Sequence, residues 1–531
     1  MQRRATWRSV CAGILAGLSV GTVACAPQQS GTGPGSELVG AGGTGELVSG
    51  GLVSAGQSGA LPSDGASTPA LEPAAGVGSM PDAPDGDVTG ASPRDDAMLP
   101  GSSSPEPGAA GEPPAVLDAG ADPYPAGPDA GSALDPELAR RYAGLSARLS
   151  LLGARTASFW LQHGPDVQFG GFHATLDRQG NPIAPEDKGL IQQARQLWML
   201  STWYERREST PALLAQTEQV YGFFRRSFLD PADGGFVYKV SRDGSRVLDA
   251  KKQLFAESYA IYALSTYARV FGAAEAGALA LGRFASIDAS RHDAVNGGYD
   301  QRSDPGTLTP GAEKDTNTHL HLLEAFAALY EATRDARVAA RLNELVDLFA
   351  TRLRQPSGYV HAEFTLSWAP FGTPRVSYGH DLETSWLLLD AARVLGRSDD
   401  ATLRASALAI AAHSVAAGFD AQAGGFFEAG PNGAAPDDRD KVWWVQFEAT
   451  EGLWWAHELD PQRLYLDRLD RTLDWIELAE DLPAGEWFAT SNADGSPAGA
   501  DYKADEWKDG YHPIRALVYL QDWIDDKLAG R

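Results

Sequence analysis

Apolar side chains after residue 134 recur every three to four positions, the spacing of amphipathic helices. Clear examples run over residues 254–270, 318–330 and 382–394, where alanine and leucine occupy positions i, i+3 and i+4. Alternation of apolar and polar residues, which would indicate half-buried strands, is scarce. The pattern therefore predicts an all-α domain.

A glycine followed closely by an aromatic residue separates these helical segments. The signals are Gly171-Phe172, Gly235-Phe236, Gly298-Tyr299, Gly358-Tyr359, Gly425-Phe426 and, more loosely, Gly485 to Trp487. Successive glycines lie 64, 63, 60, 67 and 60 residues apart, enough chain for two helices and their connections. The sequence thus predicts six helical hairpins, with short β-hairpins at the glycine turns.

Six helical hairpins can form an open superhelix or a closed ring of inner and outer helices. Candidate functional residues favour closure, because they follow the glycine of their repeat by 24, 23, 22, 19 and 27 residues: Arg195, His321, His380, Trp444 and His512. A ring would bring such equivalent positions together. We therefore predict an (α/α)6 barrel over residues 134–531.

The N-terminal 25 residues have the features of an export signal. Three arginines precede an apolar stretch from Val10 to Val23, and the segment ends in Thr-Val-Ala-Cys. The stretch is too short and glycine-rich for a membrane span, and the small residues before Cys25 resemble the lipobox of bacterial lipoproteins. We expect an exported protein of the bacterial cell envelope, lipid-anchored through Cys25, with an ordinary cleaved secretory signal as the alternative.

Residues 26–133 are dominated by Gly, Ala, Pro and Ser, with 14 acidic residues against Arg94 and with Tyr124 as their only aromatic residue. Such a composition buries too little apolar surface to offset the entropy of the chain. It predicts a disordered acidic linker between the anchor and the domain.

The charge of the chain is 44 basic minus 70 acidic residues, or −26. This excess disfavours a nucleic-acid partner, since phosphate binding requires a basic surface. A neutral, polar small molecule is the better substrate class. Both cysteines, Cys11 and Cys25, precede the domain, which excludes disulfides, thiolate nucleophiles and cysteine metal sites within it.

Two histidines in the segment 317–324 project in different directions if the segment is helical. Asn317, His321 and Glu324 share one stripe, whereas His319 projects with apolar residues. We interpret His319 as a hydrogen-bonded core residue. A His-x-His metal site is disfavoured because positions i and i+2 do not share a helix face, and we expect no metal.

The following repeats supply further candidates. His380 and Glu383 share a helix face, and a carboxylate one turn later can fix the tautomer of a histidine and favour its charged form. His512 stands at the end of a loop that enters the final predicted helix. Trp444 suits either a core position or an aromatic face that grips a sugar.

These residue types suggest proton transfer at carbon. Two histidines across a pocket can remove a proton from one face of a substrate carbon and return it to the other, since the usual histidine pKa lies near neutrality. An arginine such as Arg195 would stabilise the oxygen of the enediolate that develops. No glycine-rich phosphate loop or nucleotide motif occurs, so we expect no cofactor.

Five short motifs, in order along residues 138–531, resemble the N-acylglucosamine 2-epimerase superfamily, and most closely its cellobiose 2-epimerases. They are Gln193-Ala194-Arg195, Asn317 to His321 with Glu324, Gly379 to Glu383 with Trp386, Lys441 to Gln446 with Glu448, and Trp507 to His512 with Arg515.

The resemblance implies an (α/α)6 barrel that inverts carbon 2 of the reducing-end sugar in β-1,4-linked disaccharides such as cellobiose, lactose and mannobiose. It implies no metal or redox cofactor. The implied roles are an acid/base pair acting through a cis-enediolate (His380, His512), ligands of the oxygens at carbons 1 and 2 (Arg195, His321), orienting groups (Asn317, Glu383) and stacking platforms (Trp444, Trp507).

The chain departs from the family pattern at several positions. Pro513 stands where Asn is usual, and Asp509 replaces a small or apolar residue. Phe255, Glu257 and Tyr259 stand where Tyr, Gln and Phe are common. These changes bear on the substrate more than on the reaction.

Three other functions fit the same scaffold. A monosaccharide 2-epimerase or aldose-ketose isomerase, acting on N-acylglucosamine or mannose, shares the enediolate chemistry. A glycoside hydrolase or polysaccharide lyase would need two carboxylates astride a glycosidic bond, but the coinciding positions are histidines. A sugar-binding lipoprotein without catalysis is the third. The sequence leaves open the preferred sugar and the oligomeric state, for which a monomer is one option.

Overall fold

The computed structural model describes residues 134–304, 307–461, 463–499 and 502–531. The predicted export signal, with Cys25, and the predicted linker over residues 26–133 lie outside the described residues. No helix within the described ranges is both long and apolar enough to cross a membrane.

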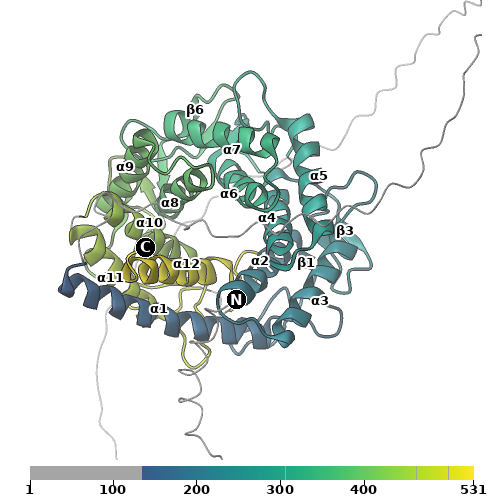
Figure 1. Ribbon diagram of the computed structural model, residues 1–531, viewed down its shortest axis with the longest axis horizontal. Coiled ribbons are helices and arrows are strands. Elements are labelled where there is room, and N and C mark those ends of the chain that lie inside the picture. Colours follow the sequence, from purple (N-terminus) through teal and green to yellow (C-terminus); the bar gives the residue numbers. More distant parts are fainter. Residues whose placement is uncertain (1–133, 305–306, 462, 500–501) are drawn as a thin grey trace, which may run out of the picture. The chain divides into compact units, whose positions relative to one another are not determined.

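Two concentric sets of helices form the domain (Figure 1). The inner helices are α2 (Leu190–Arg206), α4 (Leu254–Phe271), α6 (Thr316–Thr333), α8 (Tyr378–Val394), α10 (Trp443–Leu459) and α12 (Tyr511–Leu528). The outer helices are α1 (Pro136–His163), α3 (Pro211–Phe228), α5 (Ala274–Arg291), α7 (Ala336–Leu348), α9 (Ala401–Gly418) and α11 (Arg463–Ala479), and a short π-helical turn, η2 (Phe349–Leu353), continues α7.

The inner helices close into a ring. Each packs against the next in chain order from α2 to α12, and α12 packs against α2. Each outer helix packs mainly against one inner helix: α3 on α2, α5 on α4, α7 on α6, α9 on α8, α11 on α10, and α1 on α12. The outer helices α5, α7 and α9 also contact the next inner helix of the ring. The (α/α)6 barrel predicted from the sequence is confirmed.

Burial explains why the two sets of helices differ in sequence. In α2 all fourteen residues from Leu190 to Trp203 are buried, because this helix has neighbours on every side. The outer helix α7 buries Val338, Leu342, Leu345 and Val346, a stripe at helical spacing. The core therefore lies between the rings, where for example the rings of Phe284 on α5 and Phe326 on α6 meet edge to face.

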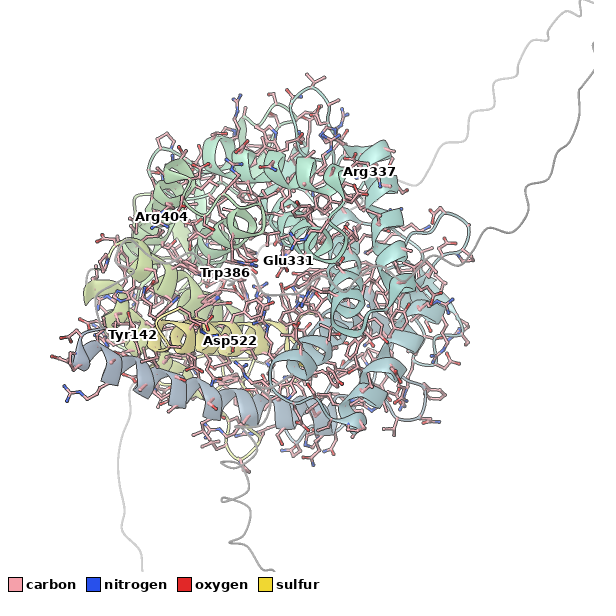
Figure 2. The ribbon with its side chains drawn as sticks, viewed as in Figure 1. Tyr142, Glu331, Arg337, Trp386, Arg404 and Asp522 are labelled. Atoms are coloured by element: carbon pink, nitrogen blue, oxygen red, sulfur yellow. The ribbon has the colours of Figure 1, made fainter. Side chains whose placement is uncertain are left out.

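Side chains occupy the space between the two sets of helices (Figure 2). Trp386 on α8 lies toward the centre of the ring, whereas Arg337 on α7 and Arg404 on α9 lie at its periphery. Tyr142 on α1 is buried and packs edge-on against Trp454 of α10, which helps to join the first outer helix to the last repeats.

Short strands precede four of the inner helices, so they gather at the end of the barrel where those helices begin. Antiparallel pairing gives the orders β1-β2-β3, β4-β5-β6, β7-β8 and β10-β9. The strands are β1 (Lys188–Gly189), β2 (Lys239–Val240), β3 (Val247–Asp249), β4 (Lys314–Asp315), β5 (Glu363–Phe364), β6 (Pro370–Phe371), β7 (Arg375–Ser377), β8 (Ala429–Pro431), β9 (Lys441–Val442) and β10 (Thr490–Ser491).

The glycine turns predicted from the sequence are tied to the inner helices by one side chain per repeat. In five repeats a buried acceptor on the inner helix bonds the backbone N–H at the turn, at 2.7 to 3.0 Å. We call these acceptors the turn-tie residues: Gln193, Glu257, His319, Asp381 and Gln446. In the sixth repeat the turn N–H of Trp487 bonds the neighbouring Glu486, which in turn accepts from Lys508.

Glycine is required at the first of these turns for two reasons. Gly171 has a φ of 70°, and a Cβ atom there would lie 2.6 Å from Oε1 of the turn-tie residue Gln193. A buried lysine reinforces the same turn, since Lys188 donates to Asp166 Oδ2 at 2.9 Å and to the Gly170 carbonyl at 2.6 Å. The repeats thus share a rigid base from which the inner helices start.

Candidate active site

The predicted site residues lie at the beginning of the inner helices, at the end of the barrel that carries the strands. Asn317 and His321 lie in the first turns of α6, His380 and Glu383 in those of α8, and Trp444 in that of α10. The remaining three are Arg195 on α2, His512 in the first turn of α12, and Trp507 in the loop before it.

The residue two positions after each turn-tie residue lies in the interior of the ring. Those positions are Arg195, Tyr259, His321, Glu383 and Glu448, and each of them bonds to a residue of another inner helix or of the final repeat. With Glu324, Tyr511, His512 and Arg515 they form one buried network. We call these nine residues the axial cluster.

The imidazoles of His380 and His512 lie against the same indole. The ring centre of Trp444 is 4.7 Å from that of His380 and 5.6 Å from that of His512. Two histidines that are 132 residues apart in the sequence therefore share one aromatic surface. Burial lowers the pKa of His380 to about 3.

Each of these two histidines is held through Nδ1. His380 Nδ1 pairs with Ser377 Oγ at 2.9 Å, and His512 Nδ1 bonds Glu448 Oε1 at 2.6 Å. Because a carboxylate accepts, His512 carries its proton on Nδ1 and keeps a lone pair on Nε2. Burial, together with the nearby positive charge of Arg195 and Arg515, places the pKa of His512 well below its usual value.

These shifts correct the sequence-based expectation that both histidines titrate near neutrality. They are neutral at pH 7 because burial disfavours the imidazolium. The interpretation that Glu383 holds His380 is also wrong: the partner of His380 is Ser377, while Glu383 Oε1 accepts from Arg515 at 2.5 Å. The opposite charge of Arg515 draws the carboxylate away from the neutral ring.

Arg515 is the centre of the axial cluster. Its guanidinium, fully buried, bonds three carboxylates from three helices: Glu324 of α6, Glu383 of α8 and Glu448 of α10. Such forked donation to carboxylates is the geometry that arginine provides and lysine does not. One cation thus crosslinks four inner helices directly beneath His512.

The pKa values of the carboxylates around Arg515 shift in different directions. Burial raises the pKa of Glu383, and the nearby charge of Glu448 adds to this effect. Burial alone would raise the pKa of Glu324 as well, but Arg515 and His321 lower it to about 2. Glu324 is therefore ionised at any pH at which the domain works, and it is the fixed negative group of the cluster.

Arg195, Tyr259 and His321 form a second chain of bonds across three inner helices. Arg195 Nη2 donates to the Tyr259 hydroxyl at 2.6 Å, and that hydroxyl lies 2.9 Å from His321 Nε2. His321 Nδ1 lies 3.1 Å from Glu324 Oε2. Arg195 also donates to the carbonyl of Trp507 at 3.2 Å, which fixes the loop before α12.

Two polar groups at the edge of the network have an oxygen without a hydrogen-bond partner among the described residues. The Oδ1 atom of Asn317 is buried and has no hydrogen-bond partner among the described residues. Asp509 Oδ2 is likewise buried without a partner there, 3.7 Å from Arg195 Nη1, and burial raises the pKa of Asp509 to about 6. The indole of Trp507 is half exposed, with Phe255 beside it.

His319 is a core residue, as its helical phase predicts. Its Nε2 accepts the N–H of Tyr299 at 2.9 Å, and its Nδ1 donates to the carbonyl of Asp315 at 2.6 Å. Both nitrogens are used in the scaffold, and burial lowers the pKa of His319 to about 3.

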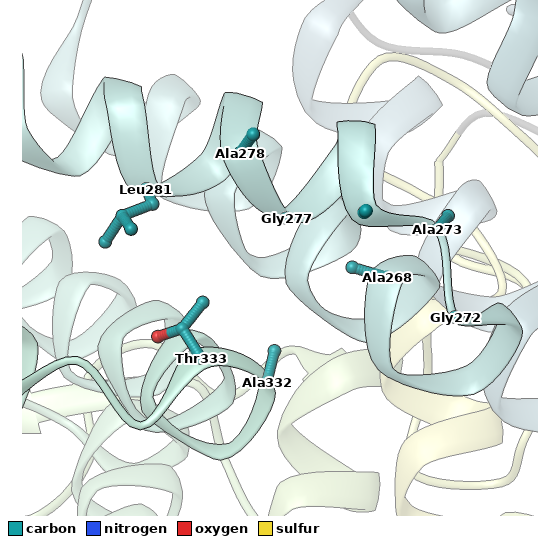
Figure 3. Close-up of a pocket in the computed structure, with 9 residues that line it drawn as sticks. Ala268, Gly272, Ala273, Gly277, Ala278, Leu281, Ala332 and Thr333 are labelled. Atoms are coloured by element: carbon teal, nitrogen blue, oxygen red, sulfur yellow. The ribbon is translucent and has the colours of Figure 1, made fainter. Parts of the chain in front are cut away.

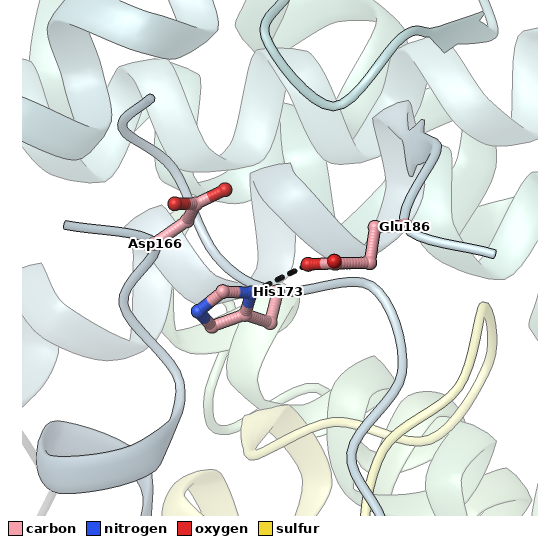
Figure 4. A group of neighbouring side chains, drawn as sticks. All are labelled: Asp166, His173 and Glu186. Atoms are coloured by element: carbon pink, nitrogen blue, oxygen red, sulfur yellow. Dashed lines mark hydrogen bonds and ion pairs between the residues drawn. The ribbon is translucent and has the colours of Figure 1, made fainter. Parts of the chain in front are cut away.

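Two groups of acidic and histidine side chains have a spacing that could suit a metal ion. In the first, Asp166, His173 and Glu186 converge (Figure 4), but Arg242 bonds both carboxylates at 2.7 to 2.8 Å. In the second, Glu383, Glu448 and His512, the cation is Arg515. The charge that a metal would supply is already present in both groups as a guanidinium.

A pocket of about 360 Å³ lies elsewhere, between the ends of α4 and α6 and the start of α5 (Figure 3). It is lined by small residues such as Ala268, Gly277 and Ala332. None of the axial cluster lines it, and it has no charged side chain in its wall. It is a gap in helix packing apart from the site.

The structure places the eight site residues predicted from the sequence at the same end of the barrel. The sequence did not predict several of the hydrogen bonds and ion pairs among the residues of the axial cluster. It gave Tyr259 and Tyr511 no role, and it named Glu448 and Arg515 only as parts of motifs. The signal for Tyr259 was its position, 64 residues after Arg195 and 62 before His321. The signal for Tyr511 was its i, i+4 spacing to Arg515 on α12.

Comparison with known proteins agrees with this arrangement. Residues 170–516 match the model of the N-acylglucosamine 2-epimerase family. The cellobiose 2-epimerase of Bacteroides fragilis is 33% identical over 392 residues, which cover 70% of this chain and 96% of that protein. The N-acylglucosamine 2-epimerase of Bos taurus is 27% identical, covering 71% of this chain and 90% of the other.

Solved structures give the same result. The cellobiose 2-epimerase of Spirochaeta thermophila superposes with a TM-score of 0.67 and 31% identity, over 75% of this chain and 100% of that one. The family match covers well over half of this chain and spans every axial-cluster residue. The chain therefore belongs to the N-acylglucosamine 2-epimerase family, and it is an isomerase of the sugar-epimerase type.

Proposed function

We propose that this protein inverts carbon 2 of the reducing-end sugar of β-1,4-linked disaccharides, with His380 and His512 as the two proton-transfer groups. The observation that carries the proposal is the pairing of the two imidazoles on the indole of Trp444, each held through Nδ1. Because Nδ1 of each ring is bonded within the protein, Nε2 is the atom that would exchange a proton with a substrate beside that indole, as a transfer between opposite faces of one carbon requires.

The chemistry follows from the protonation states. A neutral imidazole takes the proton from carbon 2, and the electrons of the C–H bond move into the carbonyl at carbon 1, which gives a cis-enediolate. Its negative charge favours the imidazolium form of the second imidazole, which takes up a proton from solvent at Nε2 and delivers it to the opposite face of carbon 2. The first imidazole releases the proton that it removed to solvent, so both rings return to the neutral form. Arg195, buried and always charged, stabilises the anionic oxygen.

Neighbouring side chains stabilise the positive charge of Arg195. Burial opposes it, but Tyr259 and Asp509 hold the pKa of the guanidinium above its usual value. Asn317 on α6 would bind a hydroxyl on carbon 1 or 2, since its Oδ1 has no protein partner among the described residues. His321, one turn further along, has both ring nitrogens bonded, to Tyr259 and Glu324, so it would bind a sugar oxygen only in exchange for one of these bonds. In this proposal Glu383 does not contact the sugar. It holds Arg515 in place through their ion pair.

Two aromatic side chains support a disaccharide as the substrate. Trp444 would stack on the reducing sugar beside the two histidines. Trp507 is half exposed on the loop before α12 and offers a second face farther out, where the non-reducing sugar would lie. The names of the relatives in Bacteroides fragilis and Spirochaeta thermophila agree with this substrate class.

The test is proton NMR of the full chain in heavy water with cellobiose, lactose, mannose and N-acetylglucosamine, each in a separate reaction. A manno-configured reducing end with deuterium at carbon 2, formed from the disaccharides, is the expected product. Ketose formation or exchange on the monosaccharides alone would assign the protein to the monosaccharide branch of the family. No exchange with any sugar would contradict the proposal.

A further inference from the structure

Tyr259 lies where the substrate-side residues of three helices meet. Its side chain is 1% exposed, and its hydroxyl stands between Arg195 Nη2 at 2.6 Å and His321 Nε2 at 2.9 Å. The guanidinium also lies over the tyrosine ring, 4.3 Å from its centre. The hydroxyl is therefore the only atom that joins Arg195 to His321 among the described contacts.

The direction of every hydrogen bond in this chain is fixed by its two ends. At one end an arginine can only donate, so the Tyr259 oxygen accepts from Arg195 and its own hydrogen is left to donate. At the other end Glu324 is ionised and can only accept, because Arg515 and His321 lower its pKa to about 2. His321 therefore donates through Nδ1–H to Glu324, and a ring with that single proton accepts at Nε2 from Tyr259.

We propose that Tyr259 is a positioning residue of the epimerase site, which holds Arg195 and His321 as one unit and keeps a ring proton of His321 on Nδ1, facing Glu324. The proposal rests on the proposed function, since Arg195, which Tyr259 holds, is the predicted ligand of the oxygen that becomes anionic. Without the hydroxyl, Arg195 would lose a fixed partner and His321 Nε2 would lose its donor.

The hydroxyl is separable from the packing of the ring. The aromatic ring of Tyr259 packs edge to face against Phe255 at 5.4 Å and against Tyr511 at 5.7 Å. A phenylalanine retains these contacts and removes only the bridging oxygen. The variant Tyr259→Phe in the full chain therefore tests the bridge with little change to the core.

We expect kcat/KM of Tyr259→Phe for the disaccharide to fall about 10-fold to 100-fold, the range for a lost hydrogen bond to a charged group. We expect the loss mainly in kcat, because Arg195 acts on the charge that develops during the reaction. The matched control is Tyr267→Phe on the same helix, whose ring stacks on Tyr221 away from the site. Its kcat should stay within about twofold of wild type.

The second measurement is the tautomer of His321 by 15N NMR of the histidine-labelled full chain, assigned with His321→Asn. Wild type should show the Nδ1–H form, and Tyr259→Phe should show a mixture of both neutral tautomers. Unchanged kcat in Tyr259→Phe, or the Nε2–H form in wild type, would overturn the proposal. If the phenylalanine variant does not fold, the wild-type tautomer decides alone.

The two proposals fail in different ways. The tautomer measurement needs no turnover, so a wild-type protein without activity on any disaccharide would overturn the proposed function and leave the bridge to be judged by NMR. A wild-type protein that turns over disaccharides, with a Tyr259→Phe variant equal to it, would retain the proposed function and overturn the role of Tyr259.

Discussion

His319 and His321 lie two residues apart on α6, yet they belong to two different regions of the molecule. His319 is a turn-tie residue that bonds the backbone of Tyr299 and Asp315. His321 belongs to the axial cluster and bonds two side chains, that of Tyr259 on α4 and that of Glu324 one turn further along α6. A shift of two positions turns a side chain by about 200° around a helix, enough to move it from the scaffold to the chemistry.

The same contrast recurs around the ring. The turn-tie residues differ in type but perform one task, since the amide oxygens of Gln193 and Gln446, the carboxylates of Glu257 and Asp381 and the imidazole of His319 all accept one backbone N–H. The residues two positions on differ in type and in task. The scaffold therefore tolerates exchange among acceptors, whereas the axial cluster depends on the identity of each side chain.

The largest effect is expected at His380. The substitution His380→Asn removes the proton-transfer group and should lower kcat about 1,000-fold, roughly 4 kcal/mol of transition-state stabilisation. Sugar binding, measured by calorimetry with the unreacted disaccharide, should remain within a few-fold of wild type. Turnover at the wild-type rate would show that His380 is not a proton-transfer group.

The next largest effect is a loss of stability when Arg515, the centre of the axial cluster, is replaced. Arg515→Met leaves Glu324, Glu383 and Glu448 without their shared cation and should lower the free energy of unfolding by about 3 to 5 kcal/mol. Urea denaturation measures it. The control is Arg337→Met, since Arg337 is 62% exposed and its ion pair with Asp335 should contribute less than about 1 kcal/mol.

Acid should destabilise the scaffold through His319. Its pKa is about 3 in the folded chain and about 6.5 when unfolded, so the unfolded chain binds the proton first as the pH falls through 6.5. Stability is then present above pH 6.5 and is lost toward pH 3. Between pH 7 and pH 4 this amounts to about 3 kcal/mol for one histidine.

The measurement is denaturation at both pH values for wild type and for His319→Gln, which has no imidazole at this position. The wild-type loss should exceed that of the variant by this amount. Buried acids such as Asp315, whose pKa burial raises to about 6, act in the opposite direction in both proteins and cancel in the comparison. Equal pH dependence would contradict the assignment of His319 as a neutral acceptor.

At neutral pH, replacing each histidine of α6 with glutamine should affect stability and activity differently. His319→Gln introduces the acceptor already used at positions 193 and 446, and should cost less than about 1.5 kcal/mol while the activity is kept. His321→Gln should show the reverse: nearly unchanged thermal stability with a large loss of kcat. The same loss of activity in both variants would remove the distinction between scaffold and cluster.

The smallest effect is expected at Asp509. Its carboxylate lies 3.7 Å from Arg195 and partly offsets the charge that would stabilise the enediolate. Because burial raises the pKa of Asp509 to about 6, the wild-type rate should fall as the pH rises through 6 and the carboxylate ionises. Asp509→Asn should raise kcat by less than about tenfold and remove this inflection from the pH profile.

Much of the fold and part of the site follow from the sequence. The helical spacing, the six glycine signals and their interval of about 60 residues are local features, and they predicted the number and order of the repeats. The phase of Asn317, His321 and Glu324 on one helix face is also local, so the separation of His319 from His321 was predictable. The partner of His380 was predicted wrongly for a non-local reason: Arg515, 132 residues from Glu383, bonds that carboxylate, and Ser377, three residues before His380, is the partner instead.

The sequence by itself thus determined the repeats, the helix faces and the identity of the candidate groups, because each depends on residues a few positions apart. Closure of the helical ring determined which of these residues contact one another. The pairing of His512 with Glu448 spans 64 residues, that of Arg515 with Glu324 spans 191, and both histidines share Trp444 only because α8, α10 and α12 are neighbours in the ring. The protonation states also required the tertiary structure, since burial and the charge of Arg515 set them.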